Sequence, residues 1–270
     1  MRIKILFEDS NILAIDKPSG VSVHPDGRSK EETITDWVVK KYPKIKNVGE
    51  PIFFEGKEIK KPGIVHRLDK ETSGVLLLVK NQKAYEFFKN QFKGREIKKT
   101  YHSIVSGFVK NDHGTINKPI GRSPKDFRRH LAGRGVRGEL REAITEYRVL
   151  KRFFTAPVVP FLGVSQADEP RGSAPRARGD SDPKKKMPER FSYLEIHPKT
   201  GRTHQIRVHM KYINHPVACD SLYNPNGSCP KGLKRLALHA KSIEFKNLKD
   251  KTIKVESPLP LEFKKIINLK

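Results

Sequence analysis

The order of its strand-like and helix-like segments is the feature that most restricts how this chain can fold. Short apolar runs bounded by turn residues predict strands, and they outnumber the amphipathic segments without alternating regularly with them. This order predicts an α+β fold with a central, mostly antiparallel or mixed sheet and flanking helices, and it argues against a doubly wound fold. Strands are expected within 3–16, 75–79, 100–109, 143–153, 191–196 and 235–256, and helices over 31–41, 82–92, 203–213 and 260–268.

One segment, residues 155–190, differs in composition from the rest of the chain. It contains six prolines and a run rich in Gly, Ser and charged residues. Such a segment cannot bury enough apolar surface to offset the entropy lost on ordering. We therefore expect a disordered insertion within a single domain that covers residues 1–270.

The charge of the chain indicates its partner. Lys and Arg number 55 against 30 Asp and Glu, which gives a formal net charge of +25. Binding of such a surface to phosphates releases condensed counterions, so nucleic acid is the leading partner. The alternative is a solvated cationic surface that only aids solubility. Because the 155–190 segment carries charges of both signs, the basic character belongs mainly to the remainder of the chain.

Targeting and cysteine content favour a cytoplasmic protein without a membrane partner. The N-terminal residues alternate apolar with charged side chains, unlike a signal peptide, and no apolar run approaches the roughly 18 residues that span a bilayer. Cys219 and Cys229 are too few for a disulfide framework, so a reducing compartment fits best. A zinc site combining them with His204 and His209 lacks the paired short spacings of zinc ligands, and no metal is expected.

A carboxylate stands at the end of a loop marked by Gly and Pro. The tetrapeptide from His66 to Asp69 directly precedes the apolar run 75–79, which is predicted to be a strand buried on both faces. A carboxylate there is held by a rigid sheet and is still reachable from a cleft. The alternative is that Asp69 only shapes a turn and Arg67 is a surface cation, since Asp is common in loops.

A second polar cluster covers residues 200–210. Thr203 is placed to cap a helix, and on that helix Thr203, Ile206, Arg207 and Met210 share one side. A cation on a side that faces the core is costly unless it is paired. Arg207 therefore needs a carboxylate, for which Asp69 is a candidate. The alternative is that Arg207 extends into solvent.

The segment 66–74, an HRLD followed by two variable residues and TSG, resembles the signature of the RluA-type pseudouridine synthases. Further segments resemble that family's motifs in the same order, and together they cover nearly the whole chain except the insertion. They are Asp16-Lys17-Pro18-Ser19-Gly20 with His24-Pro25, Lys99-Thr100-Tyr101, Gly201 to His209, and Arg235 to Ala240.

The resemblance implies an enzyme that isomerises uridine in RNA to pseudouridine without a metal or an organic cofactor. It implies that Asp69 attacks the ribose C1′, that Tyr101 stacks on the target base and assists proton removal, and that Arg207 pairs with Asp69. Arg67 would occupy the space left by the flipped base. The other substrate contacts expected from the motifs are His66, Lys99, Arg202, His204 and Gln205. The implied fold is a mostly antiparallel sheet with flanking helices and a basic cleft.

The chain departs from the family pattern in three respects. His102 replaces the usual aliphatic residue, the 155–190 insertion interrupts a strand pair, and we expect no N-terminal S4 RNA-binding domain. The last point favours a compact RNA read by its shape and by a splayed loop. We expect a monomer that acts on ribosomal or transfer RNA.

Three other functions compete with this interpretation. A non-catalytic RNA-binding protein on the same fold predicts a lost nucleophile, whereas Asp69, Tyr101 and Arg207 are all present. A glycoside hydrolase needs two acids that flank the scissile bond, and Glu71 lies too near Asp69 in sequence to be a convincing partner. A structural protein of the ribosome explains the charge but not the motifs.

Overall fold

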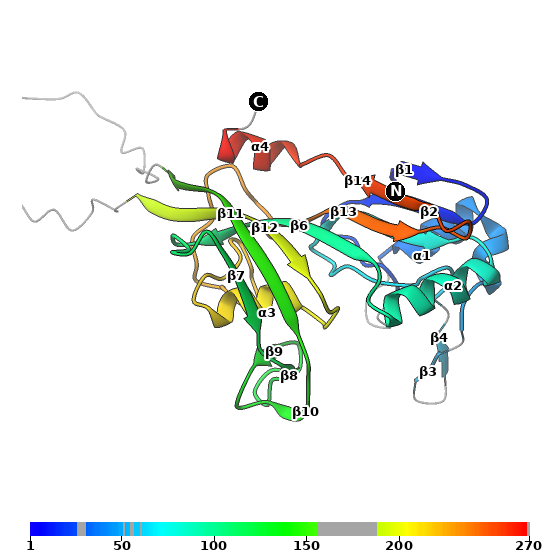
Figure 1. Ribbon diagram of the computed structural model, residues 1–270, viewed down its shortest axis with the longest axis horizontal. Coiled ribbons are helices and arrows are strands. Elements are labelled where there is room, and N and C mark those ends of the chain that lie inside the picture. Colours follow the sequence, from blue (N-terminus) through cyan, green and yellow to red (C-terminus); the bar gives the residue numbers. More distant parts are fainter. Residues whose placement is uncertain (26–30, 51, 55–56, 60, 156–187, 269–270) are drawn as a thin grey trace, which may run out of the picture.

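The architecture is centred on one nine-stranded sheet in the order β1-β2-β5-β13-β6-β12-β11-β7, with β14 paired to β13 (Figure 1). The computed structural model describes residues 1–25, 31–50, 52–54, 57–59, 61–155 and 188–268. The strands of this sheet are β1 (Lys4–Glu8), β2 (Ile12–Lys17), β5 (Ser73–Val79), β6 (Lys98–Ser106), β7 (His113–Asn117), β11 (Ile144–Thr155), β12 (Glu189–Pro198), β13 (Leu238–Lys246) and β14 (Thr252–Glu256).

The sheet is mixed, which confirms the α+β prediction. Strands β5 and β13 pair in parallel, and the other neighbours pair antiparallel. Two buried cores lie on either side of this junction. One gathers β1, β2 and β5 with α1 (Ile34–Lys41) and α2 (Gln82–Lys93). The other gathers β6, β11 and β12 with α3 (Gln205–Tyr212) and α4 (Leu261–Ile267). The junction is where the site described below forms.

Helix α1 follows directly from its sequence. Thr33 accepts a hydrogen bond from the N–H of Asp36, whose carboxylate accepts one in return from the N–H of Thr33, and this capping box begins the helix. Ile34, Trp37 and Val38 are buried in the first core, so one face of the helix packs on the sheet. A short 3-10 helix, Pro43–Asn47, continues the chain.

Strand β5 is the centre of the first core. All of its residues are buried, as its apolar composition predicts. Its second residue, Gly74, has a φ of +109°, and a Cβ at this position would collide with the carbonyl of Ala240 in β13. Glycine is therefore required where the two parallel strands meet.

The structure differs from the sequence-based expectation in several elements. It adds a second, three-stranded sheet of β8 (Ile120–Arg122), β9 (His130–Ala132) and β10 (Arg137–Arg141), which was not predicted. A short hairpin of β3 (Ile52–Phe54) and β4 (Lys57–Ile59) was also not predicted. These strands are short, and several contain Gly or charged residues, so they carry little apolar alternation.

The expected insertion at 155–190 needs correction at its edges. Thr155 and Glu189 are register partners at the ends of β11 and β12, because the ladder continues further than the apolar pattern does. Residues 156–187, and with them the expected disorder, lie outside the described residues.

Two further findings bear on the expected compartment. The structure joins Cys219 to Cys229 in a disulfide across ten residues, where the sequence favoured a reducing setting. In the described part of the chain no helix is long and apolar enough to cross a membrane. The cytoplasmic compartment stays a prediction.

Candidate active site

A cavity of about 520 Å³ opens where the two halves of the sheet meet. A second cavity of about 300 Å³ adjoins it. Arg67, Asp69, His204 and Arg207 line both cavities, so they stand at the opening between them. The walls of the larger cavity are basic. They include Lys93, Arg95, Lys99, Lys199 and Arg202.

Asp69 is positioned by the turn that leads into β5. Its carbonyl accepts a hydrogen bond from the N–H of Thr72 at 3.1 Å, and its neighbour Leu68 is buried. The carboxylate itself keeps a side-chain exposure of 20%. Its Oδ2 lies 3.4 Å from Nη1 of Arg207, and its Oδ1 lies 3.9 Å from Nε2 of His204. The expected contact between Asp69 and Arg207 is therefore present.

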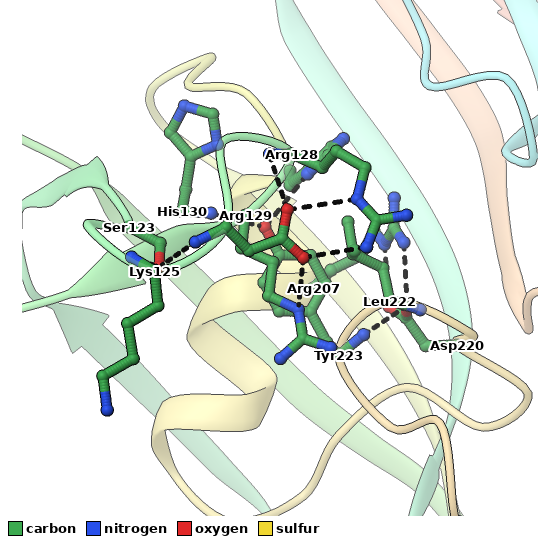
Figure 2. Close-up of polar contacts among 11 residues, drawn as sticks. Ser123, Lys125, Arg128, Arg129, His130, Arg207, Asp220, Leu222 and Tyr223 are labelled. Carbon is green, nitrogen blue, oxygen red and sulfur yellow. Dashed lines mark hydrogen bonds and ion pairs between the residues drawn. The ribbon is translucent and has the colours of Figure 1, made fainter.

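The main partner of Arg207 is a residue that the sequence did not single out. Nε and Nη2 of Arg207 donate to the two carboxylate oxygens of Asp220, each at 2.7 Å (Figure 2). Asp220 is fully buried and also accepts from the N–H groups of Leu222 and Tyr223. Burial opposes the charge of Arg207, but the hydrogen bonds and charge of Asp220, and then the charge of Asp69, raise its pKa. The guanidinium stays charged beside Asp69.

Tyr223 is a second residue that the sequence did not reveal. The guanidinium of Arg207 lies 5.1 Å from the centre of its ring, close enough for a cation–π contact. Its hydroxyl accepts from the N–H of His130 at 2.9 Å and lies 3.0 Å from Nδ1 of His204. Burial raises the pKa of Tyr223 to about 12, so it stays a neutral phenol.

The start of α3 differs from the prediction. His204, not Thr203, is the N-cap, with a φ of +55° and no side-chain capping bond. A left-handed conformation is uncommon for a residue with a side chain. Here it directs the imidazole toward Tyr223 and Asp69. Burial lowers the pKa of His204, against the opposing charge of Asp69, so the neutral ring is favoured.

Lys17 is buried beneath the loop that carries Asp69. Its ammonium donates to the carbonyls of Pro18, Val21 and Lys70 at 2.7–2.9 Å. The last of these follows Asp69 in sequence, so Lys17 fixes the backbone on one side of the carboxylate. Burial lowers the pKa of Lys17 to about 7, although the nearby charge of Asp69 favours the ammonium.

Tyr101 and Lys99 project from β6 into the larger cavity. Burial, with the charge of Asp69 adding to it, raises the pKa of Tyr101, so the phenol is neutral. Burial lowers the pKa of Lys99. The Lys99 ammonium lies 3.7 Å from where a Cβ on Gly201 would stand, which places it beside the loop that precedes α3.

The remaining predicted site residues divide into two groups. His66 and Gln205 are used within the protein. Nε2 of His66 accepts from the N–H of Leu77 at 2.9 Å. The oxygen of the Gln205 amide accepts two hydrogen bonds from the preceding loop, and its nitrogen donates two to β11, so the amide ties α3 to both. Arg67 and Arg202 lie at the rim. Arg67 contacts His24 at 3.1 Å, and Nε of Arg202 donates to the carbonyl of Glu142.

Chemically, the site presents a partly exposed carboxylate inside a basic cavity. A buried guanidinium contacts the carboxylate, and a neutral phenol shares the same cavity. This arrangement suits attack by the carboxylate on a carbon centre of a polyanionic substrate, because the walls attract phosphates and the carboxylate is the group left accessible.

Comparison with known proteins agrees with the motifs. The family model described as RNA pseudouridylate synthase matches residues 11–212. An uncharacterized RNA pseudouridine synthase of Synechocystis is 31% identical over 266 residues, which cover 98% of this chain and 68% of that protein. An uncharacterized RNA pseudouridine synthase of Aquifex aeolicus is 35% identical and shares 86% of this chain and 59% of its own length. The ribosomal large subunit pseudouridine synthase D of Borreliella burgdorferi is 34% identical, with 97% and 66% covered.

The fold is also found in solved structures. The human RNA pseudouridylate synthase domain containing 1 superposes with a TM-score of 0.68 at 21% identity, covering 96% of this chain and 84% of that one. The human domain containing 4 gives a TM-score of 0.62 at 23% identity, covering 96% and 90%. At these identities the likeness concerns the fold, and it agrees with the mixed sheet described above.

Proposed function

The chain belongs to the RNA pseudouridylate synthase family, a family of isomerases, and on that premise we propose that Asp69 is the nucleophile that converts specific uridines to pseudouridine. The observation that carries the proposal is the contact of Arg207 with Asp69 at 3.4 Å. Asp69 is the carboxylate that lines both cavities beside Arg207 and remains partly exposed, while Asp220 is buried.

The reaction begins with attack of the Asp69 carboxylate on C1′ of the ribose. The bond from C1′ to N1 breaks, and its electron pair leaves with the uracil, so the ribose is held as an ester on Asp69. This covalent step divides one difficult exchange into two easier ones. Arg207, whose guanidinium stays charged, contacts the attacking carboxylate at 3.4 Å and orients it.

The second half returns the base through a different atom. The detached uracil turns, C5 forms a bond to C1′, and the ester oxygen leaves as the carboxylate of Asp69. Loss of the proton from C5, with protonation of N1, completes the isomer. Tyr101 supplies a flat ring in the cavity against which the base can stack during this rotation, and its hydroxyl assists the transfer of the C5 proton.

The target uridine must leave its stack to reach Asp69, since base chemistry requires extrusion of the nucleotide. Arg67, exposed at the opening of both cavities, is placed to fill the space that the base leaves. Lys99, Arg202 and His204 are proposed to contact the flipped nucleotide or its phosphates. His66 and Gln205, whose hydrogen bonds are internal, act as positioning residues.

The substrate is proposed to be ribosomal or transfer RNA, with ribosomal RNA of the large subunit the first to test. Relatives from Borreliella burgdorferi, Xanthomonas campestris and Neisseria meningitidis bear names that refer to the ribosomal large subunit. The excess of basic residues is consistent with such a polyanion.

The organisation proposed for the chain is a single catalytic domain over residues 1–270, interrupted by the segment 155–190 and acting as a monomer in the cytoplasm. The single domain is supported by the sheet, which runs without interruption from β1 to β7 through the described strands of both halves.

The central test compares Asp69→Asn with a matched control, Asp250→Asn. Asp250 has a side-chain exposure of 79% and lies in the turn between β13 and β14. Loss of tritium from RNA labelled at C5 of uridine measures the reaction, and fluorescence anisotropy measures RNA binding. We expect Asp69→Asn to bind RNA and fold normally but to release no tritium, because an amide is nearly isosteric and a poor nucleophile. Wild-type release by Asp69→Asn would exclude Asp69 as the nucleophile.

A further inference from the structure

The three-stranded sheet of β8, β9 and β10, here called the arm (residues 120–141), carries more positive charge than the described acidic residues neutralise. Figure 1 shows it extending away from the main sheet, below β7 and β11. It holds seven Lys and Arg against two acids, Asp126 and Glu139. Those acids pair with Arg128, Arg129 and Arg141. No ion pair in the described structure involves the remaining arm cations, which are Arg122, Lys125, Arg134 and Arg137.

Two of these arginines lie directly opposite each other. The register pairs Arg137 of β10 with Arg122 of β8, and Arg122 in turn with His130 of β9. Directly opposed residues on neighbouring antiparallel strands project from the same face. The three side chains therefore form a row across the arm. Like charges on directly opposite residues destabilise a sheet. The opposed arginine pair therefore does not contribute to the stability of the folded protein.

The row is turned toward the candidate active site. Ile120 shares a strand face with Arg122 and is buried in a cluster with Val208 of α3 and Tyr223. At the inner end of the row, the ring of His130 lies 5.8 Å from that of His204. The N–H of His130 donates to Tyr223, the residue that also contacts Arg207 (Figure 2). The row thus runs outward from the wall of the Asp69 site.

The turn between β8 and β9 is held firmly enough to present such a row. Asp126 accepts hydrogen bonds from the backbone N–H and the side chain of Arg128. Ser123 accepts from the N–H groups of Lys125 and Asp126. A fixed turn reduces the entropy lost when a ligand is bound along the adjacent strands.

From this geometry we propose that Arg122 and Arg137 bind successive phosphates of the RNA strand that continues from the flipped uridine. The proposal rests on the function proposed above and deepens it by naming the surface that receives the flanking strand. The ligand is the sugar–phosphate backbone of single-stranded RNA, because a row one side chain wide meets one strand. Phosphate contacts of this kind fix the register of the RNA on the enzyme without reading its sequence.

The test uses the full chain and a fluorescein-labelled RNA hairpin with a uridine-rich single-stranded loop. The variant is Arg122→Gln/Arg137→Gln. The matched control is Lys264→Gln/Lys265→Gln, which removes the same charge from α4, at the opposite end of the molecule (Figure 1). Affinity is measured over a series of salt concentrations. Two lost phosphate contacts are expected to weaken binding about 10- to 30-fold at 0.1 M salt and to reduce the slope of log K against log salt by about 1.4.

Two further variants and readouts separate this role from a structural one. Arg122→Lys/Arg137→Lys keeps both charges and is expected to restore the salt slope. The Gln variant is expected to melt at or above the wild-type temperature, because the opposed charges are removed. Wild-type affinity and slope in the Gln variant, an equal loss in the α4 control, or a lowered melting temperature each overturn the proposal. Absence of pseudouridine formation by the wild-type protein would instead refute the proposed function, and the binding data would still decide the role of the arm.

Discussion

Arg207 and Asp220 form a buried, two-pronged ion pair, with both nitrogen–oxygen distances at 2.7 Å, and only Nη1 of the guanidinium reaches Asp69. The pair is separated by 13 residues in sequence, whereas Arg207 and Asp69 are separated by 138. Asp220 therefore orients the guanidinium locally, and the guanidinium in turn orients a carboxylate supplied by a distant part of the chain.

Replacement of Arg207 by Ala is expected to destabilise the fold as well as to slow the reaction. The change leaves Asp220, which is 0% exposed, without its counter-charge. Breaking one side of a buried pair costs about 3–5 kcal/mol, to be measured by urea unfolding. The control is Arg148→Ala. It removes a surface pair with Glu195 in which the arginine side chain is 62% exposed, and such pairs contribute about 0–1 kcal/mol. A wild-type unfolding curve for Arg207→Ala would mean that Asp220 gains another partner.

Tyr101→Phe is expected to retain more activity than Tyr101→Ala. Both variants lose the hydroxyl, but Phe keeps the ring that faces the cavity, and stacking on a base contributes about 1–3 kcal/mol. Single-turnover tritium release at saturating RNA compares the two directly. Equal loss in both variants would assign the main role to the hydroxyl and would contradict the emphasis on stacking.

Acidification is expected to destabilise the protein through His66. Burial, with the charge of Lys99 adding to it, lowers the pKa of this imidazole to about 3, whereas a histidine in an unfolded chain titrates near 6.5. Between these values the unfolded chain binds a proton that the folded protein does not. The stability associated with neutral His66 is therefore present above about pH 6.5 and is lost as the pH falls toward 3.

The measurement for this prediction is urea unfolding at pH 7.5 and at pH 4.5. His66→Gln keeps an oxygen that can accept from the N–H of Leu77 and removes the titration, so the difference in stability between the two pH values should shrink. His113→Gln, at the exposed end of β7, serves as the control and should preserve the wild-type difference. An unchanged difference in His66→Gln would show that other groups dominate the acid response.

Replacement of residues 157–188 by a short Gly/Ser linker is expected to preserve folding and the catalytic step. Thr155 and Glu189 are register partners, so a short linker can close the hairpin of β11 and β12. Circular dichroism and single-turnover kinetics test this expectation. If the segment tethers RNA through its basic residues, the variant will also bind RNA more weakly and with a shallower salt dependence. If it is a neutral insertion, binding will not change. A variant that fails to fold would show that the segment packs on the core.

The sequence predicted the elements that have strong local patterns. The buried strand β5, the capped helix α1 and the helix α2 all follow from apolar periodicity over their own residues. The contact of Arg207 with Asp69 was expected because a core-facing cation needs a carboxylate. That reasoning does not show which carboxylate is the main partner of Arg207. It pointed to Asp69, whereas the structure pairs Arg207 chiefly with Asp220.

Asp220 and Tyr223 were not predicted, because the loop in which they lie has no periodic spacing of apolar residues. Their roles depend on where the chain turns after α3, which is a matter of tertiary packing. A count of acids near Arg207 in sequence would have included Asp220, but nothing local shows that it is buried. The arm escaped for a related reason. Its residues are mostly polar, and the opposed arginine pair becomes visible only once the register of β8 and β10 is known.

The position of β13 in the sheet determines when the site can form during synthesis of the chain. Strands β5 and β6 are not neighbours in the sheet, and β13 hydrogen-bonds to both of them. A nascent chain that ends between Arg207 and Leu238 already contains Asp69, Tyr101 and Arg207. It still lacks β13, the strand that joins the two halves of the sheet. The cavity is therefore completed only after β13 has emerged from the exit tunnel and paired with both strands.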